Sequence, residues 1–524
     1  MTTATSTFGW NNRVAATLRE RTQTIHWQVR YREAAYVVRV GDGVAYLRGA
    51  PAVRYGELIE RPDGLTALVF ELRRHDFGAV FLDASDDVAA GDELRATGRV
   101  ASVPVGEELL GRVIDALGRP LDDGPPLAVP TAWPIEREAP GVTDRQPVAE
   151  PLHTGIKVID SLLPLGRGQR ELILGDRATG KTALAIDTIL AQRHSNVICI
   201  YTAIGQRKVT VAEVVETLSR HEALAYTVVL SADADAPAGQ QYLAPFAACT
   251  IGEYFMQRGK HVLIVYDDLT KHADAYRRIS LLLGRPPARE AYPADVFYLH
   301  GRLLERATRL HDRHGGGSLT ALPIATTQAG QISSYIPTNL ISITDGQLYL
   351  DARLFNEGRR PAIDVGLSVS RVGGKAQPVV LRQLAGDLKL LFAQLHELET
   401  FSRFGAELEP DTRQRLERGR RLREALKQPR LEPLRLGLEI ATLFAVREGY
   451  LDQVPVASVD EFLAALCQRI RSLDPDVLDG FERGEPLTET WQARLRQAIE
   501  STLVPFTSRP RNDTGTNPTA AAGR

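Results

Sequence analysis

Hydrophobic and polar positions divide the chain into three zones with different spacings. In the first zone, short runs alternate apolar and polar residues and are separated by turn signals such as Gly41-Asp42-Gly43. Closely spaced strands of this kind favour a small β-barrel. Nothing in this zone has the pattern of a catalytic group, so we interpret it as an interaction or assembly module. The predicted strands are residues 36–40, 44–47, 66–72, 79–82 and 93–100.

In the second zone, apolar runs of strand length alternate with stretches of helical composition, including residues 212–218 and 302–310. This alternation favours a mainly parallel sheet covered by helices on both faces. A proline-rich connection at 124–140 precedes the zone and is interpreted as a linker or surface loop. The predicted strands are residues 172–174, 197–203, 227–230, 262–266, 319–324 and 341–343.

In the third zone, from Leu388 onward, apolar residues recur at the three- and four-residue spacing of an amphipathic helix. The pattern predicts a helical C-terminal domain. Its many arginines are interpreted as a solvated face rather than an RNA-binding surface. The predicted helical faces are residues 388–401, 436–446, 462–470 and 491–503.

Composition narrows the possible partners. A formal net charge of -2 over 524 residues gives no general attraction to nucleic acid or to a membrane surface. No apolar run reaches membrane-spanning length, and residues 1–10 lack the pattern of a secretory signal, so membrane contact is expected to be indirect, through partners. Cys199, Cys249 and Cys467 are far apart in apolar runs, which favours core packing over metal or disulfide chemistry.

The strongest chemical signal is a phosphate-binding loop. An apolar run, 172–174, leads into Gly-x-x-x-x-Gly-Lys-Thr and then into a stretch of helical composition, the order that this motif requires. Backbone amides of such a loop surround phosphate oxygens, the lysine reaches the outer phosphates and the hydroxyl binds Mg²⁺. The sequence therefore predicts a nucleoside triphosphate site at Gly175, Asp176, Arg177, Ala178, Thr179, Gly180, Lys181 and Thr182.

Two further positions belong to this site. Asp267 ends an apolar run, where a strand-end carboxylate would hold Mg²⁺ directly or through water. A self-sufficient ATPase also needs a group that polarises the attacking water, commonly a glutamate. Gln206 follows the strand predicted at 197–203 and carries a neutral amide that cannot take a proton. We therefore expect poor hydrolysis, although glutamine orients water in some GTPases.

Several motifs together resemble the alpha subunit of the F-type ATP synthase over roughly residues 28–500. They are the phosphate loop, Ala203-Ile-Gly-Gln206, and the segments 291–300, 318–323, 337–347 and 365–373. The resemblance implies a RecA-like P-loop core with an N-terminal β-barrel and a C-terminal α-helical domain, in an α/β chain. The expected boundaries are 1–27 for an N-terminal segment, 28–98 for the barrel, 99–383 for the nucleotide-binding domain, 384–506 for the helical domain and 507–524 for a disordered tail.

The resemblance also implies a ring in which alpha subunits alternate with catalytic beta subunits around a gamma central shaft, three of each. Peripheral-stalk subunits are further expected partners, and the expected location is the cytoplasmic face of the bacterial inner membrane. The complex makes ATP from ADP and phosphate, or hydrolyses ATP, coupled to ion flow. The alpha subunit binds Mg-ATP without turning it over and lends an arginine finger, here Arg371, to the neighbouring beta site. Ser342 resembles a residue close to the same interface.

By the same matching, Phe355, Arg360 and Gln428 are expected near the chain's own nucleotide. Three positions depart from the family pattern around that site. They are Ala178, where the loop usually has Gln, Thr326, where Glu is usual, and Arg430, which replaces a second adenine-region Gln. In the family, an N-terminal helix docks the peripheral stalk, and the first 27 residues here match that helix poorly. This departure favours a divergent second-copy version of the synthase. These departures predict altered regulatory nucleotide binding with in-trans catalysis retained.

The alternative is a self-sufficient hexameric motor, such as a secretion ATPase or a Rho-like RNA translocase. Such a motor should have a glutamate at the position that Gln206 occupies here, and it should work without a second type of chain. A translocase should also show exposed aromatic and basic residues on its barrel, and residues 36–100 have no such concentration. An inactive nucleotide-binding scaffold is a third possibility, against which the intact surroundings of Arg371 argue.

Overall fold

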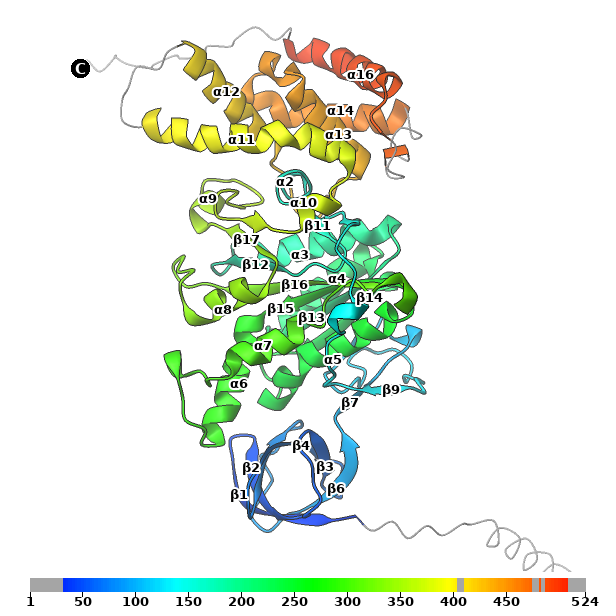
Figure 1. The fold of residues 1–524 in the computed structure, drawn as a ribbon, viewed down its shortest axis with the longest axis vertical. Helices are drawn as coiled ribbons and strands as arrows, with labels where there is room; N and C mark the ends of the chain where they lie inside the picture. Colours follow the sequence, from blue (N-terminus) through cyan, green and yellow to red (C-terminus); the bar gives the residue numbers. More distant parts are fainter. Residues whose placement is uncertain (1–31, 403–409, 474–479, 482–485, 508–524) are drawn as a thin grey trace, which may run out of the picture.

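The computed structural model describes residues 32–402, 410–473, 480–481 and 486–507. The N-terminal segment expected at 1–27 lies outside the described residues, as does nearly all of the tail expected at 507–524. Figure 1 shows an elongated molecule with a barrel at one end, a layered α/β body in the middle and a group of helices at the other end. Three zones with the expected secondary structure are thus confirmed, while their boundaries remain predictions.

The N-terminal zone is a closed barrel of six antiparallel strands in the order β1-β2-β5-β4-β3-β6. Alternate residues fill its interior, including Val37 and Leu47. The sequence patterns found every strand except β3, which has only four residues and therefore too short an alternation to stand out. The strands are β1 (Ala34–Gly41), β2 (Val44–Gly49), β3 (Glu57–Glu60), β4 (Thr66–Leu72), β5 (Phe77–Phe81) and β6 (Glu93–Val100).

The middle zone is built on an eight-stranded sheet in the order β18-β17-β12-β16-β15-β13-β14-β8, parallel except for β18. Its strands are β8 (Val113–Ile114), β12 (Glu171–Gly175), β13 (Val197–Ile204), β14 (Thr227–Ala232), β15 (His261–Asp267), β16 (Ser318–Thr326), β17 (Gly346–Leu350) and β18 (Val369–Ser370). Two small sheets flank it, β7 (Ser102–Pro104) with β9 (Ala132–Pro134), and β10 (Pro151–Leu152) with β11 (Leu165–Gly166).

Helices cover both faces of this sheet, as predicted. Tyr201 of β13 shares a core with α3 (Lys181–Leu190) and α4 (Lys208–Arg220), whereas its neighbour Ile200 shares a second core with α5 (Ala238–Met256) and α6 (Leu269–Leu282). The remaining helices of this body are α2 (Lys157–Leu162), α7 (Val296–Leu304), α8 (Tyr335–Ile343), α9 (Ala352–Asn356) and α10 (Gly373–Ala376). Short 3-10 turns are η1 (Glu107–Leu109), η2 (Val142–Asp144), η3 (Ala191–His194), η4 (Ala223–Tyr226), η5 (Arg289–Ala291) and η6 (Asp312–His314).

Two element predictions in this zone are wrong. Residues 341–343, predicted as a strand, form the end of helix α8, and the strand is the following β17. A three-residue apolar run does not separate a buried helix from a strand. The helix predicted at 302–310 ends at Leu304, because the backbone of Arg309 and Leu310 instead forms β-bridges with Ser318 and Arg145.

The C-terminal helices are continuous with the body. Leu381 and Leu384 of α11 lie in the same hydrophobic core as Ile159 of α2. The helices are α11 (Val379–Ser402), α12 (Pro410–Ala425), α13 (Leu436–Arg447), α14 (Val459–Leu473) and α16 (Glu489–Thr507), with 3-10 turns η7 (Tyr450–Gln453) and η8 (Val456–Ser458). Across the described residues, no helix combines the length and apolar character that crossing a bilayer requires.

A buried histidine pair in the body makes stability sensitive to acid. His272 Nδ1 lies 3.3 Å from His300 Nε2, and both rings are fully buried. Burial lowers the pKa of His272 well below its usual range and that of His300 to about 4. With these lowered pKa values, the unfolded state binds more protons than the folded state in acid. The contribution of the neutral pair to the free energy of unfolding is therefore complete above the unfolded pKa of about 6.5, and it is lost as pH falls toward the folded pKa.

We expect His300→Gln to lose less stability than the parent chain between pH 7 and pH 4.5. The difference should be about 2–3 kcal/mol, since each unit of pKa shift corresponds to about 1.4 kcal/mol. Urea unfolding of the full chain at both pH values measures it. His75→Gln, at an exposed position, is the control and should follow the parent. Equal losses in parent and His300→Gln would contradict the expectation.

Candidate nucleotide-binding site

The phosphate loop joins β12 to α3, as its motif requires. A Cβ at Gly175 would stand 2.6 Å from the backbone O of Leu350, so glycine is needed for the close approach of β17. Gly180 precedes the helix with φ of 99°, in the left-handed region that glycine adopts without strain. The helix N-terminus that follows presents unpaired backbone N–H groups, the usual site of phosphate binding.

A cavity of about 640 Å³ opens beside this loop. Its lining brings together eight of the predicted residues: Ala178, Thr179, Gly180, Lys181, Thr182, Phe355, Arg360 and Gln428. The guanidinium of Arg360 stands over the Phe355 ring, 5.0 Å from its centroid. One pocket large enough for a nucleotide is therefore enclosed by the phosphate loop, by Phe355 of α9 and Arg360 after it, and by the segment that follows α12.

Gln428 is held by backbone groups. Its Nε2 donates to the O of Gly155 at 2.7 Å and to the O of Glu432 at 2.8 Å, and its Oε1 accepts from the N of Lys157 at 3.1 Å. With the amide engaged in this way, Gln428 fixes the shape of the cavity wall. Neighbouring Pro429 and Arg430 complete that wall.

Lys181 is buried at the base of the loop. Its Nζ donates to the backbone O of Gly175 at 2.8 Å and to that of Asp176 at 2.6 Å. Burial lowers the pKa of Lys181, while Asp268 and Asp267 nearby act in the opposite direction. An ammonium surrounded by carbonyl oxygens at a helix N-terminus is placed to bind phosphate oxygens.

Asp267, at the end of β15, is the centre of a hydrogen-bond network. Its Oδ2 accepts from Thr182 Oγ1 at 2.7 Å and from the Tyr201 hydroxyl at 2.9 Å, and its Oδ1 accepts from Gln206 Nε2 at 2.7 Å. Burial raises the pKa of Asp267, and burial together with the Asp267 charge raises that of Asp268 to about 6. A hydroxyl and a carboxylate at this separation form an oxygen donor set that fits Mg²⁺, whose charge would offset that of the phosphates.

Two residues of the loop, Asp176 and Arg177, do not line the cavity. The Asp176 carboxylate accepts from Thr327 Oγ1 at 2.5 Å and from the N of Gly330 at 3.0 Å, so it fixes the segment after β16. Arg177 is exposed. Sequence reasoning missed Asp187, which lines the cavity and accepts from the N of Leu431 at 2.7 Å. It also missed Tyr201, hidden within an apolar strand, and no sequence signal distinguishes that tyrosine from a core residue.

Arg371 and Ser342 lie away from this cavity. Arg371 is exposed just after β18, and its Nη1 approaches the backbone O of Thr344 at 3.5 Å. Ser342 is exposed on α8, where its hydroxyl donates to the O of Thr338 at 3.0 Å. Thr344 follows α8 directly, so both side chains belong to one surface region. No ion pair joins Arg371 to a carboxylate within the described part of the protein.

Comparison with known proteins identifies the family. The family model for the ATP synthase alpha/beta nucleotide-binding domain matches residues 155–370, and the model for the C-terminal domain of the ATP synthase alpha/beta family matches 377–502. ATP synthase subunit alpha 2 of Syntrophus aciditrophicus (strain SB) is 53% identical over 481 residues, which span 92% of this protein and 93% of the relative. The chain belongs to the ATP synthase alpha subunit family. ATP synthase subunit alpha of Aquifex aeolicus (strain VF5) is 51% identical over 484 residues, which span 92% and 96%.

Membership of the alpha-subunit family makes the chain part of an ATP synthase complex. The nucleotide-binding model spans the phosphate loop, Gln206 and Asp267, and it ends one residue before Arg371. Family membership also favours the alpha-subunit interpretation over the self-sufficient motor. The expected fold class, a P-loop core with a terminal barrel and a helical C-terminal domain, is confirmed.

Proposed function

We propose that this chain is the regulatory, non-catalytic nucleotide-binding subunit of its synthase. The supporting observation is the bond from Gln206 Nε2 to Asp267 Oδ1 at 2.7 Å. It places a neutral amide beside the carboxylate at which Mg²⁺ would be held. An amide cannot accept the proton of an attacking water, so Mg-ATP bound in the cavity is retained rather than hydrolysed.

We further propose that Arg371 acts in trans, at the catalytic site of a neighbouring beta subunit. Its exposed guanidinium forms no ion pair with a carboxylate among the described residues, and it lies away from the chain's own cavity. A guanidinium stays protonated and offers planar donors to the charge that develops on a transferring phosphoryl group. Ser342, in the same surface region, would lie at that interface.

The remaining partners follow from the same proposal. Beta subunits alternate with this chain, a gamma shaft occupies the centre and peripheral-stalk subunits attach outside. The complex stands on the cytoplasmic face of the bacterial inner membrane and contacts the bilayer only through its ion-translocating sector. Neither the net charge of -2 nor the barrel surface favours nucleic acid as a partner.

The test is ATP turnover by the purified chain, alone and mixed with beta subunits. We expect negligible turnover by the chain alone and Mg²⁺-dependent turnover by the mixture. Brisk hydrolysis by the chain in isolation would disprove the non-catalytic role. Turnover by beta subunits that is unchanged when this chain is added would disprove the in-trans role.

We expect this chain to bind Mg-ATP more weakly than an ordinary alpha subunit does, although it does not hydrolyse the nucleotide it binds. Ala178 and Arg430 line the cavity at positions where glutamine is usual, and Thr326 Oγ1 donates to Asp268 Oδ2 at 2.8 Å where a glutamate is usual. Each lost hydrogen bond costs on the order of 1 kcal/mol, or about fivefold in affinity. Calorimetric titration of the isolated chain with Mg-ATP, beside the Aquifex alpha subunit as reference, measures the difference. Equal affinity in the two proteins would contradict this expectation.

A further inference from the structure

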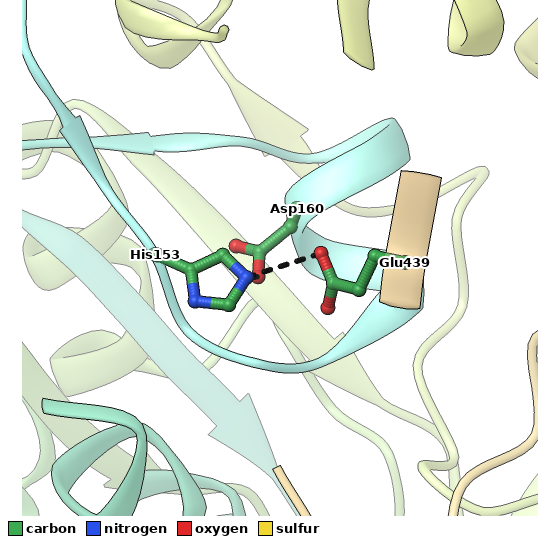
Figure 2. Close-up of side chains that lie close together, drawn as sticks. All are labelled: His153, Asp160 and Glu439. Atoms are coloured by element: carbon green, nitrogen blue, oxygen red, sulfur yellow. Dashed lines mark hydrogen bonds and ion pairs between the residues drawn. The ribbon is translucent and has the colours of Figure 1, made fainter. Parts of the chain in front are cut away.

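A second cluster of ligand-type side chains lies outside the nucleotide cavity. His153, Asp160 and Glu439 each offer one ligand atom, and all three atoms lie within 4.8 Å of one another. His153 Nε2 is 3.3 Å from Asp160 Oδ2 and 3.2 Å from Glu439 Oε2. Figure 2 shows the imidazole and the two carboxyl groups turned toward a common point between α2 and α13.

Hydrogen bonds from neighbouring segments hold Asp160 and the backbone of His153 in place. The Asp160 carboxylate accepts from the N of Thr154, the hydroxyl of Thr154 and the N of Gly155, at 2.8–3.1 Å. The backbone O of His153 accepts from Gln192 Nε2 at 2.8 Å. The bonds to the Asp160 carboxylate are of the kind that orients metal-binding side chains.

Glu439 supplies the observation that points to a cation. Its side chain is 1% exposed, and its Oε1 has no hydrogen-bond partner among the described residues. A second buried carboxylate, Asp160, stands close by. Two buried carboxylates with one orphaned oxygen are costly unless a positive charge offsets them, and in this cluster that charge is either a bound cation or a protonated His153. Lys157 is close enough to act electrostatically on Glu439, but its Nζ donates to the backbone O of Ala425 at 2.5 Å and forms no ion pair with either carboxylate among the described residues.

The spacing fits a small tetrahedral ion. Zn²⁺ binds histidine nitrogen and carboxylate oxygen at about 2.0–2.2 Å, which places neighbouring ligand atoms about 3.3 Å apart. The two distances from His153 Nε2 match that separation. An entry path exists, because His153 is partly exposed and lines an open cavity of about 540 Å³.

We propose that His153, Asp160 and Glu439 form a Zn²⁺ site, with water in the fourth position facing the cavity. The ion joins α2 of the nucleotide-binding body to α13 of the C-terminal helices. The site also adjoins the nucleotide cavity, because Gly155 and Lys157 hold Gln428. The proposal does not depend on the regulatory role, since it concerns metal binding in the absence of nucleotide.

The experiment is calorimetric titration of the chelator-treated full-length protein with Zn²⁺, without nucleotide. His153→Gln and Glu439→Gln are the test variants, and His194→Gln, at the rim of the same cavity, is the matched control. We expect one site in the parent protein and the control, and at least tenfold weaker binding in both test variants, in line with the effects of altered metal surroundings. Circular dichroism and retained Mg-ATP binding establish that the variants fold.

A spectroscopic measurement on the parent protein addresses the case in which a variant misfolds. Co²⁺ in place of Zn²⁺ should give the intense visible absorption of a tetrahedral site, and added Zn²⁺ should displace it. No Zn²⁺ binding by the parent protein, or binding unchanged in both test variants, would overturn the proposal and leave a hydrogen-bonded His153–Glu439 pair. Co²⁺ absorption of octahedral intensity would overturn it as well.

Discussion

Replacing Arg371 with alanine is expected to lower steady-state ATP hydrolysis by the assembled complex about 10³- to 10⁵-fold while leaving assembly intact. Arginine fingers supplied by a neighbouring subunit contribute effects of this size. Arg371 is exposed, and its one side-chain hydrogen bond among the described residues is a 3.5 Å approach to the O of Thr344, so its removal takes little from the fold. Turnover of a reconstituted alpha–beta–gamma complex, with size-exclusion chromatography for assembly, measures both parts.

Two variants accompany this experiment. Arg371→Lys keeps the charge but loses the planar donor fork, so it should recover only a small part of the activity. Arg220→Ala, at a position 71% exposed on α4, removes an arginine from elsewhere on the surface and should retain full turnover. Full turnover by a complex that contains Arg371→Ala would contradict the proposal that Arg371 acts at the neighbouring catalytic site.

The second large effect is expected from Lys181→Ala, which should weaken Mg-ATP binding by the isolated chain at least about a hundredfold. Hydrogen bonds to charged groups are worth about 1.5–3 kcal/mol, and this ammonium is the buried cation of the phosphate loop. The fold should persist, because helix α3 keeps its apolar face against the sheet. Equilibrium binding of a fluorescent ATP analogue provides the measurement.

Lys208→Ala, at a position 66% exposed at the start of α4, is the matched control and should bind as the parent does. A Lys181→Ala variant that binds within about threefold of the parent would show that the cavity does not use the phosphate loop. The same variant in the full complex should still stimulate beta-subunit turnover, because Arg371 lies outside the cavity.

The sequence predicted the layered body well because parallel strands are buried on both faces and therefore appear as continuous apolar runs. It failed where that signal was too short to interpret. Residues 341–343 look like a strand but end helix α8, and β3 is too short to show its alternation. The end of α7 was misplaced because tertiary bridges at Arg309 and Leu310 override a helical composition.

For the site, motif spacing predicted the phosphate loop and its carboxylate, since β12, α3 and β15 are local units with fixed geometry. Asp187 and Tyr201 escaped notice because their roles depend on contacts with Leu431 and Asp267, which lie far away in the sequence. The His153–Glu439 pair spans 286 positions and belongs to no motif, so only the folded structure reveals it. A motif within one strand–loop–helix unit can be recognised in the sequence, whereas a contact between residues far apart in the chain cannot.

The common core of α2 and α11 has a mechanical consequence. Leu381 and Leu384 pack with Ile159, and α2 begins one residue after Ile156, which lines the nucleotide cavity. Close-packed interiors have low compressibility and transmit strain. A force on the far end of the helical group would therefore be transmitted through α2 to the wall of the cavity, so that load on these helices and the shape of the cavity are coupled within a single polypeptide.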